Sequence, residues 1–170
     1  WTYHYARTFW LLIFGMIHAY FIWYGDILVT YALCGFVVYW FRNLSVPALF
    51  LIGCISLLVA LLIMMSAGVA PVDVQQGILE DFVPNPVDSD REIAAYRGTW
   101  SDVQNARLIE ALDIQFAGIP FFLYWRAGGL MLIGMALFKL GVFSVTRSVK
   151  FYIRLLGVAG LIGFPLVAHS

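Results

Sequence analysis

The sequence predicts an all-α fold, a polytopic transmembrane helix bundle of about five spans that forms a single membrane domain over residues 1–170. Three observations predict it. The chain is 62% hydrophobic and only 12% charged, about half the charge of a soluble domain. Its apolar residues fall into runs long enough to cross a bilayer. Most of its acids gather in one polar segment, residues 68–113, between two of these runs.

The first apolar run, residues 9–41, is too long for one helical crossing of about 20 residues. It contains two groups that ionise near neutral pH, His18 and Asp26. We therefore expect two short spans joined by a tight turn at Gly25 and Asp26. The five expected spans are residues 8–24, 26–41, 47–67, 116–143 and 151–168.

The polar segment at 68–113 carries nine acids against three bases, and we expect it to be partly helical. Asp88 or Ser89 can cap a short helix. Further on, Thr99 and Asp102 have the spacing of a capping box, which predicts the start of a second, amphipathic helix. We expect this helix to lie on the outer membrane surface or against the bundle, and to bend directly into the fourth span.

Basic residues outside that segment predict the orientation of the chain. Arg7 and Arg42 flank the first two spans, and Arg147, Lys150 and Arg154 lie between the last two. Five alternating spans bring all of these residues to one side of the membrane. Cytoplasmic loops favour Lys and Arg, so this side is predicted to be cytoplasmic and the polar segment at 68–113 to lie outside.

His18 is the first candidate site residue. It lies about ten residues into the first predicted span, near the middle of the membrane, where an ionisable group is a functional candidate. It can act there as a proton acceptor or as a polar group lining a cavity. The alternative is a neutral imidazole that bonds a carbonyl or the hydroxyl of Tyr20, Tyr24 or Tyr31.

Asp26, Arg126 and Arg107 are the other cavity-lining candidates. Asp26 can cap the second span, or it can line an outer entrance and pair with Arg126 or Arg107. Arg126 follows a tryptophan and a tyrosine, which is typical of an arginine that extends to the membrane interface. If it points inward instead, its guanidinium suits an anion or a carboxylate.

Arg147, Lys150 and Arg154 form a predicted basic cluster on the cytoplasmic side. Anionic lipid headgroups explain such a cluster fully. Contact with the phosphate of a nucleotide or coenzyme is the alternative. No catalytic residue is assigned from the pattern of residues alone.

Other classes of site find no support. The histidines, His4, His18 and His169, are spread along the chain, so no metal centre is predicted. Cys34 and Cys54 lie within apolar runs and are expected to be free thiols. Basic residues do not cluster as they do in nucleic-acid-binding proteins, so we expect no nucleic-acid partner.

Glycines predict where helices approach one another. Gly128, Gly129 and Gly134 lie in the fourth span, and Gly157 and Gly163 lie in the fifth. Close helix contacts in lipid use such residues. The alternative is that glycine is simply common in membrane helices.

Several stretches of the chain resemble the YeiB-like family of bacterial inner-membrane proteins, a family without an assigned function. They are Leu11–Tyr20 (LLIFGMIHAY), Trp23–Leu28 (WYGDIL), Tyr31–Gly35 (YALCG), Tyr96–Trp100 (YRGTW), Arg107 and Leu130–Leu137 (LMLIGMAL). The resemblance implies a multi-pass protein of the bacterial cytoplasmic membrane. The family is similar to transmembrane acyltransferases, which move acyl groups from a cytoplasmic donor such as acyl-CoA to an outer sugar.

The resemblance therefore implies an acyltransferase-like enzyme that acts on envelope glycans, or the C-terminal part of one. Family members usually begin with a helix carrying an Asp-x-x-Arg-Gly motif, which this sequence lacks. The catalytic histidine of the acyltransferases is expected in that missing half, so the catalytic role is not transferred to His18.

The alternative is a non-catalytic polytopic subunit that packs against other membrane protein chains, or against its own missing N-terminal half. A small transporter is a third possibility, but no repeat or pair of broken helices supports it.

Overall fold

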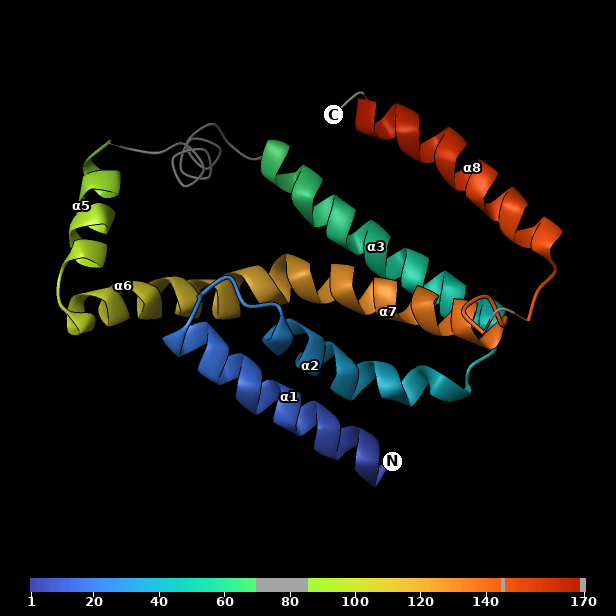
Figure 1. Ribbon diagram of the computed structural model, residues 1–170, viewed down its shortest axis with the longest axis horizontal. Coiled ribbons are helices and arrows are strands. Elements are labelled where there is room, and N and C mark those ends of the chain that lie inside the picture. Colours follow the sequence, from blue (N-terminus) through green and yellow to red (C-terminus); the bar gives the residue numbers. More distant parts are fainter. Residues whose placement is uncertain (70–85, 145, 169–170) are drawn as a thin grey trace.

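The computed structural model describes residues 1–69, 86–144 and 146–168, and every regular element in that part of the chain is helical (Figure 1). The prediction of an all-α fold is confirmed. The part of the predicted polar segment at 70–85 lies outside the described residues. In chain order, the elements are α1 (Thr2–Phe21), α2 (Leu28–Val38), the 3₁₀ helix η1 (Tyr39–Asn43), α3 (Val46–Gly68), α5 (Pro86–Arg97), α6 (Trp100–Asp113), the π-helix η2 (Ile114–Leu123), α7 (Tyr124–Lys139) and α8 (Val149–Ala168).

Helices α1 and α2 form the predicted hairpin, but its first helix differs from the predicted span. Helix α1 extends from Thr2 to Phe21, whereas the span was placed at 8–24. The chain leaves the helix because the amides of Ile22 and Trp23 both donate to the carbonyl of His18, at 2.9 and 2.8 Å. His18 consequently lies in the last turn of α1 and not near the middle of the helix.

The two helices of this hairpin pack closely at Gly15. A Cβ atom at this position would lie only 2.8 Å from the amide nitrogen of Val29 in α2. Any larger residue would push α2 away, so Gly15 sets the spacing of the hairpin. Glycines in the later spans had been predicted to mark contacts, whereas Gly15 had not.

Helices α3 and α7 form the centre of the molecule, where they lie side by side (Figure 1). A Cβ atom on Gly53 would lie 3.0 Å from the carbonyl oxygen of Gly129, and one on Gly129 would lie 2.9 Å from that of Gly53. The hydroxyl of Ser56 donates to the carbonyl of Trp125 at 2.7 Å. The predicted contact at Gly129 is therefore confirmed.

Gly128 also lies at a helix contact, since a Cβ atom there would be 3.8 Å from the sulfur of Cys34, but contacts predicted at other glycines are not seen. A Cβ atom on Gly134, Gly157 or Gly163 would meet nothing within 4 Å. The last two belong to α8, which lies at the edge of the fold and exposes Leu161 and Phe164 (Figure 1).

The helices of the polar segment begin near their predicted positions. Helix α5 starts at Pro86, slightly before the predicted caps at Asp88 or Ser89. The Thr99–Asp102 capping box is confirmed, since the amide and the hydroxyl of Thr99 donate to the Asp102 carboxylate at 2.8 and 2.7 Å.

Helix α6 is followed directly by η2 and then by α7, and the chain bends between α6 and α7 as predicted. The two arms, Trp100–Pro120 and Tyr124–Lys139, meet at 57°. Pro120 lies inside the π-helical stretch, where its ring and missing N–H disturb the regular α-helical bonding. The bend therefore has a specific local cause.

Membrane-spanning capacity is more limited than predicted. Within the described residues, one helix, Val46–Ser66, is long and apolar enough to cross a bilayer by itself. The bent pair Trp100–Pro120 and Tyr124–Lys139 adds a second crossing if it counts as one span. The structure thus supports a helical fold with one or two candidate crossings.

Candidate functional site

His18 and Asp26 meet at the turn between α1 and α2. The Nδ1 atom of His18 lies 2.8 Å from Oδ1 of Asp26. The Asp26 side chain is almost completely buried, at 2% exposed, whereas that of His18 is 32% exposed. A buried carboxylate therefore holds an imidazole that still reaches the surface.

His18 and Asp26 each have a different partner from those that the sequence predicted. The predicted alternatives gave His18 a tyrosine hydroxyl or a carbonyl, and gave Asp26 an arginine, Arg126 or Arg107. The structure pairs the two candidates with each other, because the turn returns the chain to the end of α1. The second Asp26 oxygen accepts a bond from the Val29 amide at 2.8 Å, so the expected capping role is also present.

The dyad has a defined chemical consequence. When His18 donates its Nδ1 proton to Asp26, Nε2 carries the lone pair. The same arrangement orients the imidazole of Ser-His-Asp enzymes and stabilises the imidazolium that forms when Nε2 takes a proton. The Trp23 ring meets the imidazole edge to face, with centroids 6.4 Å apart. The geometry is thus suited to a general base.

Helix α6 braces the end of α1 beside the dyad. Gln104 donates to the carbonyl of Tyr20 at 2.6 Å, and Arg107 donates to that of Phe21 at 2.5 Å. Carbonyls in the last turn of a helix lack partners within that helix, so these bonds satisfy them. Arg107 therefore caps the C-terminal end of α1 and does not pair with Asp26.

A further side-chain bond joins the end of α1 to η2, the segment that follows α6. The hydroxyl of Tyr20 donates to Oε1 of Gln115 at 2.8 Å. Sequence reasoning missed Gln104 and Gln115 as members of this network. The spacing of Gln104 and Arg107, three residues apart on one helix face, was the available signal.

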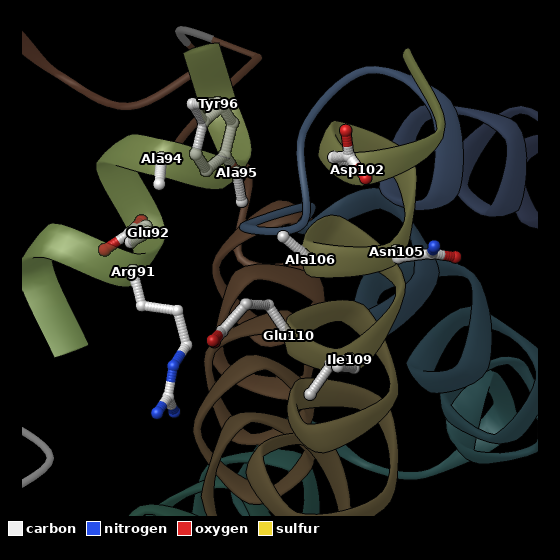
Figure 2. A pocket seen from close by; sticks show the side chains of 10 residues that line it. All are labelled: Arg91, Glu92, Ala94, Ala95, Tyr96, Asp102, Asn105, Ala106, Ile109 and Glu110. Carbon is white, nitrogen blue, oxygen red and sulfur yellow. The ribbon is translucent and has the colours of Figure 1, made fainter. Parts of the chain in front are cut away.

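A pocket of about 730 Å³ lies between α5 and α6 (Figure 2). Three acids line it, Glu92, Asp102 and Glu110, together with Arg91 and Tyr96. Alanines form much of the remaining wall, as Figure 2 shows for both helices.

Two acids of this pocket act electrostatically on the turn that holds the dyad. The phenol of Tyr24 lies within electrostatic range of Glu92, Tyr96 and Glu110. The polar end of the hairpin and the polar faces of α5 and α6 therefore share one side of the molecule.

Arg126 lies elsewhere, on α7. It lines a cavity between α2 and α7 together with Thr30 and Tyr31. Its guanidinium carbon is 6.0 Å from the centre of the Phe122 ring. The predicted candidates are thus divided between two places, with His18, Asp26 and Arg107 at one and Arg126 at the other.

The predicted basic cluster lies near the junction of α7 and α8. Arg147 donates through Nε to the carbonyl of Leu140 at 2.8 Å, where it caps the end of α7. Lys150 and Arg154 are exposed and one turn apart on α8. Among the described residues, no three His, Cys, Asp or Glu side chains are grouped to hold a metal ion.

Comparison with known proteins gives one short similarity. No family model matches the chain, and no solved structure matches it. Over 47 residues, the chain is 55% identical to the uncharacterized protein YxaH of Bacillus subtilis (strain 168). The match covers 28% of this chain and 11% of YxaH. It is too short to show a family.

Proposed function

We propose that this chain is part of a multi-pass bacterial membrane protein of the YeiB-like family, and that it contributes to an acyltransferase-like activity on envelope glycans. The observation that carries the proposal is the 2.8 Å contact between His18 and the buried Asp26. Both residues belong to the stretches that resemble the family. A base that is oriented but still accessible is what acyl transfer to a hydroxyl requires.

The dyad can supply one step of such a reaction. Nε2 of His18 takes the proton of an acceptor hydroxyl as its oxygen attacks the carbonyl of a thioester-bound acyl group that has been delivered to the outer side. The carbon–sulfur bond breaks, the imidazolium returns the proton to the leaving thiolate, and an ester remains on the acceptor. Asp26 stabilises the imidazolium throughout.

The pocket between α5 and α6 supports a hydroxyl-rich acceptor. Glu92, Asp102 and Glu110 offer carboxylate oxygens that accept hydrogen bonds from sugar hydroxyls, and Arg91 offers donors. Tyr96 provides an aromatic surface for a sugar ring. At about 730 Å³, the pocket falls within the range of small-molecule sites.

We further propose the five-span arrangement with the polar segment outside. The exposed apolar surfaces of α1, α3 and α8 and the distribution of basic residues support it. Single cysteines in place of Asn105 and Lys150, in a chain with Cys34 and Cys54 replaced by serine, test it. In intact cells, a membrane-impermeant maleimide should label position 105 and not position 150; equal labelling of both positions contradicts the arrangement.

The catalytic proposal is tested in the full-length protein, in a strain that lacks the endogenous gene. Purified protein is given acetyl-CoA and isolated envelope glycan, and release of free CoA is followed. His18→Ala should lower the rate by about 100-fold or more, because general-base catalysis contributes at least that factor. Tyr3→Ala, at an exposed position on the opposite end of α1, is the control and should keep its activity.

Unchanged turnover in a folded His18→Ala protein would remove the dyad from the mechanism. No acyl transfer by the wild-type protein, with no difference in glycan acylation between the strains by mass spectrometry, would refute the enzyme assignment.

A non-catalytic polytopic subunit is the second candidate function. It is favoured by the capping bond from Val29 to Asp26, which gives the carboxylate a purely structural use. The uncovered glycines of α8 offer a face for a partner chain. In this case His18→Ala would lower stability or assembly and would leave acylation unchanged.

A further inference from the structure

The cavity between α2 and α7 is a second site, separate from the dyad. Its volume is about 390 Å³. Helix α2 contributes Thr30 and Tyr31, and the π-helix and α7 contribute Leu123, Arg126, Leu130 and Met131. The cavity thus has an apolar wall and a small group of polar side chains.

Thr30 is the first sign that a ligand belongs here. The residue is only 3% exposed, and its hydroxyl oxygen has no hydrogen-bond partner within the described part of the protein. Leaving a buried hydroxyl unsatisfied costs about 1–3 kcal/mol. Thr30 lines the cavity, so a rotation of its side chain toward an acceptor oxygen of a ligand there would remove that cost.

Arg126 is the second sign. Arg126 is exposed, the described residues include no acid within ion-pair distance of its guanidinium, and the Phe122 ring lies near it. A guanidinium without a carboxylate, lining the same cavity as an unsatisfied hydroxyl, is suited to an anionic group with several oxygens. Phosphate and carboxylate both meet this description.

The apolar wall of the cavity indicates the chemistry of the rest of the ligand. Leu123, Leu130 and Met131 line it, and apolar surface dominates its wall. Such a wall gains free energy by covering an alkyl chain and gains none by covering a polar nucleotide. The volume is sufficient for one chain but small for a bulky polar head.

We propose that this cavity binds an amphipathic anion, with its acidic headgroup at Arg126 and Thr30 and an alkyl chain along Leu123, Leu130 and Met131. The headgroup is a lipid phosphate or a fatty-acid carboxylate. The inference does not depend on the dyad, because it uses none of its residues.

Native mass spectrometry of the full-length protein in detergent tests this. Dioleoyl phosphatidylglycerol, oleate and dioleoyl phosphatidylcholine are added separately, and the bound fraction is measured against concentration. One equivalent of phosphatidylglycerol or oleate should bind more tightly than phosphatidylcholine. Preference for phosphatidylglycerol identifies a phospholipid, and preference for oleate identifies a fatty acid. Equal binding of all three overturns the proposal.

Three variants locate the bound anion. Arg126→Gln should weaken binding by roughly tenfold or more, the value of a charge-assisted bond, and Arg126→Lys should restore part of it. Thr30→Val removes the hydroxyl at nearly constant volume and should also weaken binding. Arg154→Gln removes an exposed guanidinium on α8 and should bind like the wild type.

Equal anion binding by Arg126→Gln, with a thermal transition like that of the wild type, would place the anion elsewhere and overturn the proposal. If Arg126→Gln does not fold, Arg126→Lys and Thr30→Val decide it, since wild-type affinity in both would have the same meaning.

Discussion

Replacing Asp26 with alanine should destabilise the protein strongly, because one buried carboxylate serves two helices. One oxygen accepts a bond from His18 in the last turn of α1, and the other accepts a bond from the Val29 amide in the first turn of α2, each at 2.8 Å. Alanine removes both bonds at once and leaves two polar nitrogens without partners.

The size of the effect follows from these two bonds. Loss of a helix-capping side chain costs about 1 kcal/mol. Loss of a bond to a charged group costs about 1.5–3 kcal/mol. Asp26→Ala should therefore lower the free energy of unfolding by about 2.5–4 kcal/mol. Asp26→Asn keeps an oxygen for Val29 and should cost only the second part, about 1.5–3 kcal/mol.

Denaturant unfolding in detergent, followed by tryptophan fluorescence, measures these values. Asp90→Ala, at an exposed position on α5, is the control and should stay within about 0.5 kcal/mol of the wild type. In a double-mutant cycle, His18→Ala should cost less in the Asp26→Ala background than in the wild type. The reasoning is refuted if Asp26→Ala unfolds like the control, or if the two substitutions simply add.

Two further predictions concern the contact between α3 and α7 and the cap of α6. Gly129→Ala should destabilise the fold by about 1–3 kcal/mol, because its Cβ would lie 2.9 Å from the carbonyl of Gly53; Gly134→Ala, with nothing within 4 Å, should be neutral or stabilising in the same unfolding assay. The hydroxyl and amide of Thr99 hold the pKa of Asp102 below its usual value. The cap should therefore stabilise α6 fully above about pH 4, and this stabilisation should be lost as pH falls through the lowered pKa. Amide exchange in the first turn of α6, corrected for the intrinsic rate, should accelerate only in that acid range. The Asp102→Asn variant should lose this pH dependence.

Local chemistry explains what could be predicted of the fold. The capping box at Thr99 and Asp102 depends on two residues three positions apart, so the sequence contains the whole motif. The start of α1 was missed for a different reason. The predicted span began where the apolar residues begin, near Thr8, but backbone hydrogen bonding extends the helix through polar residues back to Thr2. Hydropathy predicts burial in lipid and not the ends of helices.

The candidate site, like the fold, could be predicted from the sequence only in part. His18 and Asp26 were each identifiable because an ionisable residue is rare in an apolar run. Their contact with each other could not be predicted, because it depends on how the chain turns after Phe21. There the amides of Ile22 and Trp23 both donate to the carbonyl of His18. Gln104 and Gln115 were missed because a neutral amide carries no sign in the sequence of the partner that it bonds.

The bend in the α6–η2–α7 segment gives this long helix the properties of a lever. The arm from Trp100 to Pro120 is roughly 30 Å long at about 1.5 Å per residue. A change of about 5° at the joint would displace the Trp100 end by roughly 3 Å, while Leu123 and Arg126, close to the pivot, would scarcely move. A small adjustment where the alkyl chain is proposed to lie would thus be amplified at the other end, where α6 faces α5.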